Sequence, residues 1–168
     1  MVAATDSRRL TLLDSMALLG ALALALALLP GRVSYLHHLI FEMPPGSWAD
    51  ILESIVRTSM PFLYYPALVL IPLRLRRPRP SGTWLLRQPG FVACCMVVLS
   101  AILVSLIGIH PRAHHIVVGG LIAGSWLILA VNRWWAGEAS WLDRTGRVIG
   151  ACWIGLAFLQ GLGLYFRA

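Results

Sequence analysis

The chain has 168 residues, of which 58% are apolar and only 12% are charged, and its mean hydropathy is +0.76. A soluble domain carries about 25% charged residues, so this composition excludes a soluble globular protein and indicates a polytopic membrane protein. The net charge of +7 comes from fourteen arginines, with no lysine, against seven acidic residues. These arginines flank apolar segments and do not form a basic face with interleaved aromatic residues, so we expect anionic lipid head groups, and no nucleic acid, as partners.

Five apolar stretches account for most of the chain, and each approaches or exceeds the length of about 20 residues that a transmembrane helix needs. Little sequence is left for a separate soluble domain. We therefore predict a single domain over residues 1–168, an all-α integral membrane protein folded as a compact bundle of five transmembrane helices. The predicted spans cover residues 10–29, 48–73, 89–109, 111–135 and 141–166.

The first predicted span, residues 10–29, is preceded by two arginines and is followed by Pro30, which stops a helix. Thr11 and Asp14 have the spacing of a capping box and favour a helix that begins at this point. The segment 25–27 reads Ala-Leu-Ala, which would also suit the cleavage site of a secretory signal. We expect an uncleaved helix, because a cleaved signal has an apolar core of only about 7–15 residues.

The second predicted span, residues 48–73, begins with Ser47 and Asp50 as a capping pair. Its first turns are amphipathic, so Arg57 can extend toward the membrane surface with Glu53 as an ion-pair partner one turn earlier. Three prolines lie inside this segment, and each removes a backbone donor and disturbs the preceding turn. The pattern indicates either a bent helix or a broken helix that lines a cavity, as in some transporters. The prolines are Pro61, Pro66 and Pro72.

The third and fourth predicted spans are joined by a link as short as His110-Pro111, so they should form an antiparallel hairpin. The fifth predicted span opens with Ser140 and Asp143, another capping pattern. We expect this aspartate, like Asp14 and Asp50, to stabilise exposed N–H groups at a helix start and not to take part in chemistry.

The arginines predict the orientation of the chain, because basic residues near the ends of spans are retained on the cytoplasmic side. With five spans and a cytoplasmic N-terminus, ten arginines lie inside and four outside, and the C-terminus is outside. The densest basic run lies between the second and third spans and serves as a topology anchor. Its members are Arg74, Arg76, Arg77 and Arg79.

All five histidines fall on the outer side in this topology, together with several acidic residues. Imidazole and carboxylate groups are common ligands of zinc, copper and non-haem iron. His110 and His114 have the spacing of two ligands on one helix face, although Pro111 lies between them. The candidate metal ligands are His37, His38, Glu42, Glu53, His110, His114 and His115.

Three interpretations of this His/acid cluster remain open. The side chains could be polar residues where loops meet lipid head groups, ligands of a divalent metal or axial ligands of a haem, or groups in a proton-linked process. We expect no cofactor, with haem or a divalent metal as the alternative. A transport function requires one of four histidines to converge with Glu42 or Glu53 over a cavity, namely His37, His38, His114 or His115.

Small residues recur at intervals of four in the last two predicted spans, a spacing that lets helix backbones approach closely. We expect these glycines to pack the two spans against each other, with a seam between copies of the chain as the alternative. The pairs are Gly120 with Gly124, Gly146 with Gly150, Ala151 with Gly155, and Ala157 with Gly161.

The chain contains no H-E-x-x-H, C-x-x-C or glycine-rich phosphate loop, and no serine pairs with a histidine and an acid by spacing, so an enzyme is not expected. The sequence favours a small protein of the bacterial cytoplasmic membrane that acts as a structural or interaction component of a membrane assembly, with other membrane subunits as partners. The alternative is a small transporter or a redox or metal carrier that uses the His/acid cluster.

Overall fold

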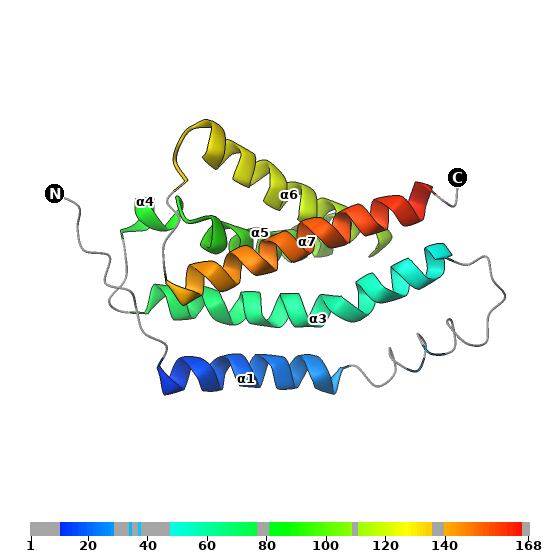
Figure 1. Cartoon of the computed structure of the whole chain (residues 1–168), viewed down its shortest axis with the longest axis horizontal. Helices are drawn as coiled ribbons and strands as arrows, with labels where there is room; N and C mark the ends of the chain where they lie inside the picture. The colour runs from blue at the N-terminus through cyan, green and yellow to red at the C-terminus, as the bar shows by residue number, and fades with distance from the viewer. Residues whose placement is uncertain are drawn as a thin grey trace.

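The structure, a computed structural model, describes residues 11–28, 34, 37, 48–76, 81–108, 111–135 and 140–165. Every regular element within these ranges is a helix, as the sequence predicted (Figure 1). The helices are α1 (Leu12–Ala27), α3 (Trp48–Leu75), α4 (Gly82–Leu85), α5 (Pro89–Ile107), α6 (Pro111–Val131) and α7 (Trp141–Tyr165). The single turn of α4 was not predicted.

Four of these helices, α3, α5, α6 and α7, are long and apolar enough to cross a membrane. The first predicted span differs from the other four in the structure, because α1 is apolar but has only 16 residues. At 1.5 Å per residue such a helix measures about 24 Å, whereas the hydrocarbon core of a bilayer is about 30 Å thick. The predicted ends of this span, residues 10 and 29, lie outside the described residues.

The capping box predicted at the start of α1 is confirmed. The Asp14 backbone N–H donates to Thr11 Oγ1 at 3.2 Å, and the Thr11 N–H donates to Asp14 Oδ2 at 3.1 Å. The Asp14 carboxylate thereby satisfies a backbone donor that the helix itself leaves unpaired.

α3 is one continuous helix from Trp48 to Leu75, with Pro61, Pro66 and Pro72 inside it. It bends visibly along its length (Figure 1). The bent-helix interpretation is therefore confirmed and the broken-helix interpretation is wrong, because the turns next to each proline remain helical.

α6 ends at Val131, four residues before the predicted end of that span. The Arg133 N–H donates to the Ala130 carbonyl at 3.1 Å and the Trp134 N–H to the Leu129 carbonyl at 2.9 Å, which is the Schellman pattern of helix termination. Arg133 occupies the position usually held by glycine and has φ 55°. The turn was missed because the sequence has no glycine there.

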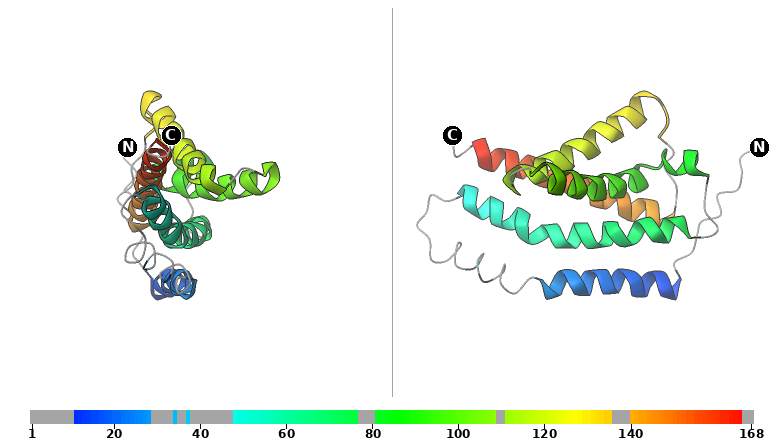
Figure 2. Two further views of the ribbon diagram at one scale, coloured as in Figure 1. Left: turned by 90° about the vertical axis from the view of Figure 1, so that its right-hand side faces the viewer. Right: turned by 180° about the vertical axis from the view of Figure 1, so that it is seen from behind.

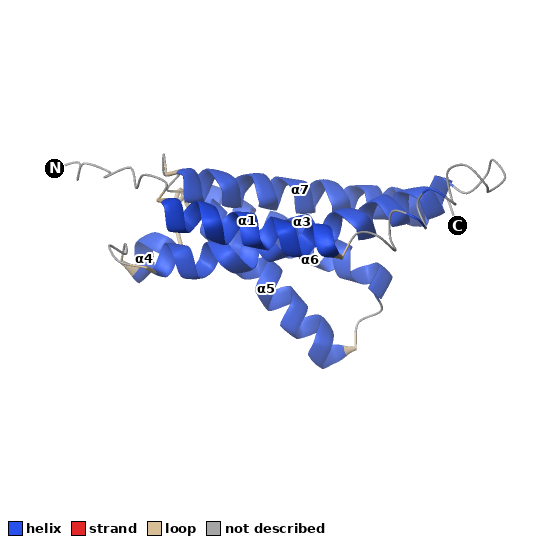
Figure 3. Ribbon diagram, turned by 90° about the horizontal axis from the view of Figure 1, so that it is seen from below, coloured by secondary structure: helices blue, strands red, loops and turns tan. Residues whose placement is uncertain are grey.

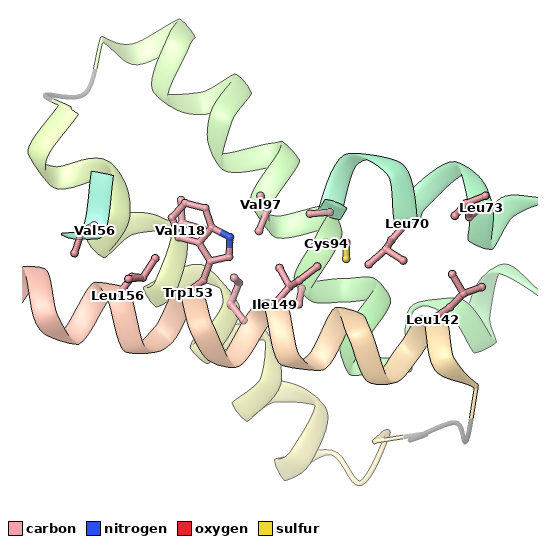
Figure 4. Close-up of a cluster of buried hydrophobic side chains, with 13 residues drawn as sticks. Val56, Leu70, Leu73, Cys94, Val97, Val118, Leu142, Ile149, Trp153 and Leu156 are labelled. Atoms are coloured by element: carbon pink, nitrogen blue, oxygen red, sulfur yellow. The ribbon is translucent and has the colours of Figure 1, made fainter. Parts of the chain in front are cut away.

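α7 lies at the centre of the bundle and packs against α3, α5 and α6, while α1 packs on α3 at the edge (Figure 2). Trp153 of α7 is fully buried in the core, among Val97 of α5, Val118 of α6 and Ile149 of α7 (Figure 4). Many leucines and isoleucines on the outside of the helices are exposed, as expected where lipid covers them.

The C-terminal half of α5 diverges from α3 and α7 before the chain returns in α6 (Figure 3). Gly108, with φ 67°, ends α5 in the left-handed conformation that glycine adopts without strain. The bundle thus has two different ends. At one end, called here the α4 end, α3 finishes and α5 and α7 begin (Figure 1). At the other, the splayed end, α5 separates from its neighbours (Figure 3).

Candidate functional site

The candidate site is built around two consecutive histidines in the first turns of α6, His114 and His115. Both are buried, with exposed fractions of 6% and 4%. Their ring centroids lie 5.5 Å apart, and the His115 ring stacks on the indole of Trp153 at 6.0 Å with an interplanar angle of 25°. Since α6 begins at Pro111, the imidazoles are carried on the regular part of the helix and held in place by a core tryptophan.

Three nitrogen atoms of this pair, His114 Nδ1, His114 Nε2 and His115 Nδ1, are buried and have no hydrogen-bond partner among the described residues. An imidazole nitrogen is either a donor or an acceptor, so each of these atoms needs a partner. Leaving one buried and unsatisfied costs about 1–3 kcal/mol. The pair is therefore costly to the fold unless another group contacts it.

Both histidines line a cavity of about 530 Å³ at the splayed end of the bundle. Its walls come mainly from α3, α5 and α6, so the divergence of α5 creates the space. The polar wall residues besides the histidines are Arg57, Tyr64, Tyr65 and Ser105. The apolar wall residues are Leu28, Met60, Pro61, Ala101 and Val104.

The charge at this cavity is balanced locally. Arg57 Nη2 forms an ion pair with Glu53 Oε1 one turn earlier on α3, as the sequence predicted. Both side chains interact electrostatically with His115. His114 and His115 therefore share the wall of this cavity with Arg57, whereas Glu53, the partner of this arginine, is not among the described residues that line it.

The other predicted metal ligands do not join this group in the part of the structure that is described. His37 is exposed and does not line the cavity, while His38, Glu42 and His110 lie outside the described residues. Within the described ranges, no three His, Cys, Asp or Glu side chains come together in a group that could hold a metal ion.

Two tyrosines of the site were not predicted from the sequence. Tyr64 and Tyr65 pack edge to face, with ring centroids 5.9 Å apart, and both line the cavity. They follow Arg57 by seven and eight residues, which is two turns of an α-helix and the same face. Their spacing of two helical turns from Arg57 is the sequence signal that predicts them on the same helix face.

The α4 end of the bundle carries a second buried polar cluster. Arg74 is 5% exposed and its Nε donates to Gln88 Oε1 at 3.0 Å, and Asp143 Oδ2 pairs with Arg147 Nε at 3.1 Å. The space beside Arg74, Gln88 and Asp143 measures only about 10 Å³, room for about one water molecule. This end is therefore closed, whereas the splayed end is open enough for a ligand.

The predicted topology anchors are only partly described. Arg74 is buried in the cluster above, and Arg76 is exposed, whereas Arg77 and Arg79 lie outside the described residues. Ser140 caps α7, because its Oγ accepts from the Asp143 N–H at 3.4 Å, and the Asp143 carboxylate is itself a cap, because its Oδ1 accepts from the Gly90 N–H at 2.9 Å. The second bond was not expected, since it caps α5 and not α7.

Among the predicted packing glycines, Gly146 lies against the backbone of Gly90, and Gly150 lies in a close contact where a Cβ atom would come within 2.6 Å of Trp126 and 2.9 Å of Ala93. Around the other four, a Cβ atom would meet nothing within 4 Å, so they do not bring helices of the monomer together. The four are Gly120, Gly124, Gly155 and Gly161. Close packing also uses two glycines that were not predicted, Gly90 and Gly119.

Comparisons with models of protein families, with curated proteins and with solved structures find no match to this chain.

Proposed function

We propose that this protein is a membrane-embedded binding protein or small carrier that holds an amphipathic molecule in the cavity at the splayed end. One observation carries the proposal: His114 and His115 are buried, have nitrogen atoms without partners among the described residues, and line that cavity. Buried polar groups in native proteins are almost always hydrogen-bonded, and the exceptions deserve an explanation. A bound ligand would supply the missing partners when the two rings turn their nitrogens toward the cavity.

The size and lining of the cavity support the same function. Its volume of about 530 Å³ lies within the range of about 300–1,000 Å³ found for small-molecule sites. Its wall combines apolar side chains with a few polar groups, the mixture that fixes the orientation of an amphipathic ligand. The closed polar cluster at the α4 end would stop the ligand from passing through the protein without a conformational change.

The proposed location is the bacterial cytoplasmic membrane, with the N-terminus inside and the C-terminus outside. The arginine bias supports this orientation, because ten of fourteen arginines then lie on the cytoplasmic side. In this orientation the α4 end faces the cytoplasm and the cavity faces the outer leaflet. Labelling of single cysteines introduced at residues 76 and 108 with a membrane-impermeant thiol reagent tests it, after Cys94, Cys95 and Cys152 have been replaced by alanine.

The function is tested by filling the cavity. The protein is purified in mild detergent, small molecules are extracted, and mass spectrometry compares the wild type with Ala101→Phe, whose new side chain enters the cavity wall. The matched control is Ile102→Phe, the next residue of α5, which is 52% exposed. We expect a molecule that co-purifies with the wild type and the control and is lost from the filled variant. The same extract from all three proteins would contradict the proposal.

A second candidate function, a component of a membrane assembly, is favoured by the four glycines that face open space. No helix of the monomer packs closely on these four glycines, so a helix of a neighbouring subunit or of another copy of the chain could pack there. The four are Gly120, Gly124, Gly155 and Gly161. Replacing Gly155 and Gly161 by leucine should then reduce the amount of complex recovered by cross-linking in membranes. An unchanged cross-linking pattern would argue against this candidate.

A further inference from the structure

The cavity has a chemical character that narrows its ligand, provided that the proposed binding function holds. Arg57 is the one permanently charged residue among the described side chains that line it, and this arginine is already paired with Glu53. Glu53 does not line the cavity but neutralises this arginine, so an anionic head would compete with the Glu53 carboxylate for Arg57, and a cationic head would meet the arginine itself. Because like charges repel at this range, the balance of charge favours a neutral head group.

The hydrogen-bonding groups of the wall favour a head group with oxygen atoms. A neutral imidazole offers one N–H donor and one acceptor nitrogen, and three such nitrogens of His114 and His115 lack partners in the described part of the chain. Tyr64 and Tyr65, whose phenol groups can both donate and accept, line the same cavity. Carbonyl oxygens accept from these donors, and the hydroxyl groups of the corresponding reduced molecule can donate to the acceptors.

The wall also favours a flat ring with an apolar substituent. The His114, His115, Tyr64 and Tyr65 rings offer aromatic edges and faces, against which a planar ring packs in offset or edge-to-face geometry. Met60, Pro61 and Val104 supply the apolar remainder of the wall. The splayed end of α5 has strongly exposed Leu106 and Ile107 beside this region, an apolar surface that an alkyl tail could follow toward lipid.

We infer that the cavity between α3, α5 and α6 binds a neutral, planar, carbonyl-bearing amphiphile, the chemistry of a membrane quinone and its quinol. His114 and His115 hold the ring oxygens, and the apolar wall holds the ring and the first part of the tail. The inference concerns binding alone and assigns no electron transfer to the protein.

The test measures equilibrium binding to the purified full chain in detergent with probes that share a long alkyl chain but differ in the head. The probes are a decyl-substituted benzoquinone, dodecanoate and dodecylamine. We expect saturable binding of the quinone with a Kd at least about tenfold below that of either charged probe, which corresponds to about 1.4 kcal/mol. Equal or tighter binding of dodecanoate would overturn the inference.

Variants of the site separate binding from folding. His115→Phe keeps an aromatic ring and removes both nitrogens, so quinone binding should weaken at least about tenfold, a loss within the range for removing hydrogen bonds to a ligand. His115→Gln keeps a donor and an acceptor and should recover part of the affinity. The matched control is Gln160→Leu, since Gln160 is also buried with an unpartnered Oε1 but does not line the cavity; its affinity should be unchanged. Equal affinity in His115→Phe and the wild type would overturn the inference.

The result for the inference is distinguishable from the result for the proposed function. If the quinone does not bind but the wild type still carries a small molecule that Ala101→Phe loses, the ligand class is wrong and the binding function stands. If the quinone does not bind and no molecule is lost from Ala101→Phe, both are wrong. Circular dichroism and size-exclusion chromatography confirm that each variant is folded before binding is measured.

Discussion

The Gly90 backbone N–H donates to Asp143 Oδ1 at 2.9 Å, joining the first turns of α5 and α7 across 53 residues of sequence. The same carboxylate pairs with Arg147 through its second oxygen. Asp143 is 2% exposed, so one buried side chain satisfies an orphan helix donor and neutralises a cation. This contact fixes the α4 end as the closed end of the bundle.

Removing the Asp143 carboxylate should therefore destabilise the protein strongly. We expect Asp143→Ala to lower the free energy of unfolding by about 3 kcal/mol, because it leaves the Gly90 N–H and the Arg147 side chain without this partner in a buried site. Asp143→Asn keeps an oxygen that can accept from Gly90 and should cost less. The measurement is unfolding in mixed detergent and SDS, with the exposed Arg144→Ala as the control. A loss no larger than that of the control would show that the contact does not hold this end together.

Gly146 should not tolerate a side chain, because α5 and α7 cross there with their backbones in contact. A Cβ atom on Gly146 would lie 2.4 Å from the Gly90 carbonyl oxygen, which is backbone and cannot move aside like a flexible side chain. We expect Gly146→Ala to cost at least about 2 kcal/mol, in the range of overpacking a core.

The matched control for this substitution is Gly155→Ala in the same helix, where a Cβ atom meets nothing within 4 Å. Alanine is a better helix former than glycine by about 0.5–1 kcal/mol, so this variant should be as stable as the wild type or more stable in detergent. Two variants with the same change in stability would contradict the packing found here.

Arg133 is the site of a stabilising substitution. Its φ of 55° is a conformation that costs an L-residue about 1–2 kcal/mol and costs glycine little. Arg133 is exposed, so Arg133→Gly loses no packing and should raise the stability by about 1 kcal/mol. Gly108→Ala is the mirror experiment, because Gly108 has φ 67° and should lose a similar amount. A drop in melting temperature for Arg133→Gly would show that the Arg133 side chain makes a contribution larger than the backbone strain.

The sequence predicted the positions of the helices well and the contacts between them poorly. Capping depends on residues close together in the sequence, so Thr11 and Asp14 predicted the start of α1 correctly. The end of α6 was missed because Arg133 takes a backbone conformation that its side chain does not favour. The face that a helix turns toward its neighbour depends on tertiary packing, and for that reason the close contact falls on Gly119 and not on Gly120.

The candidate site was predictable in part. The predicted topology put His114 and His115 on the same side of the membrane as Glu53, and the structure brings the two histidines to the same cavity as Arg57, the partner of Glu53. The depth of the histidines was not predictable, because burial against Trp153 depends on how α6 and α7 cross. The hydropathy of the sequence predicted these histidines near a membrane–water interface, whereas in the structure they lie in the wall of a cavity.

The two histidines give a prediction in which stability and binding change in opposite directions. If the buried nitrogens of His114 and His115 have no partner in the empty protein, replacing either ring by phenylalanine removes an unsatisfied polar group and keeps most of the packing. We expect His114→Phe and His115→Phe to raise the stability of the ligand-free protein by about 1 kcal/mol each.

Gln160→Leu, which also removes a buried unpartnered atom, should stabilise by a similar amount and leave ligand retention unchanged. Thermal unfolding before and after extraction of co-purified molecules measures both quantities. A buried histidine that serves only to bind a ligand lowers the stability of the protein when the site is empty. If both phenylalanine variants are less stable than the wild type after extraction, the imidazoles stabilise the fold and do not serve a ligand.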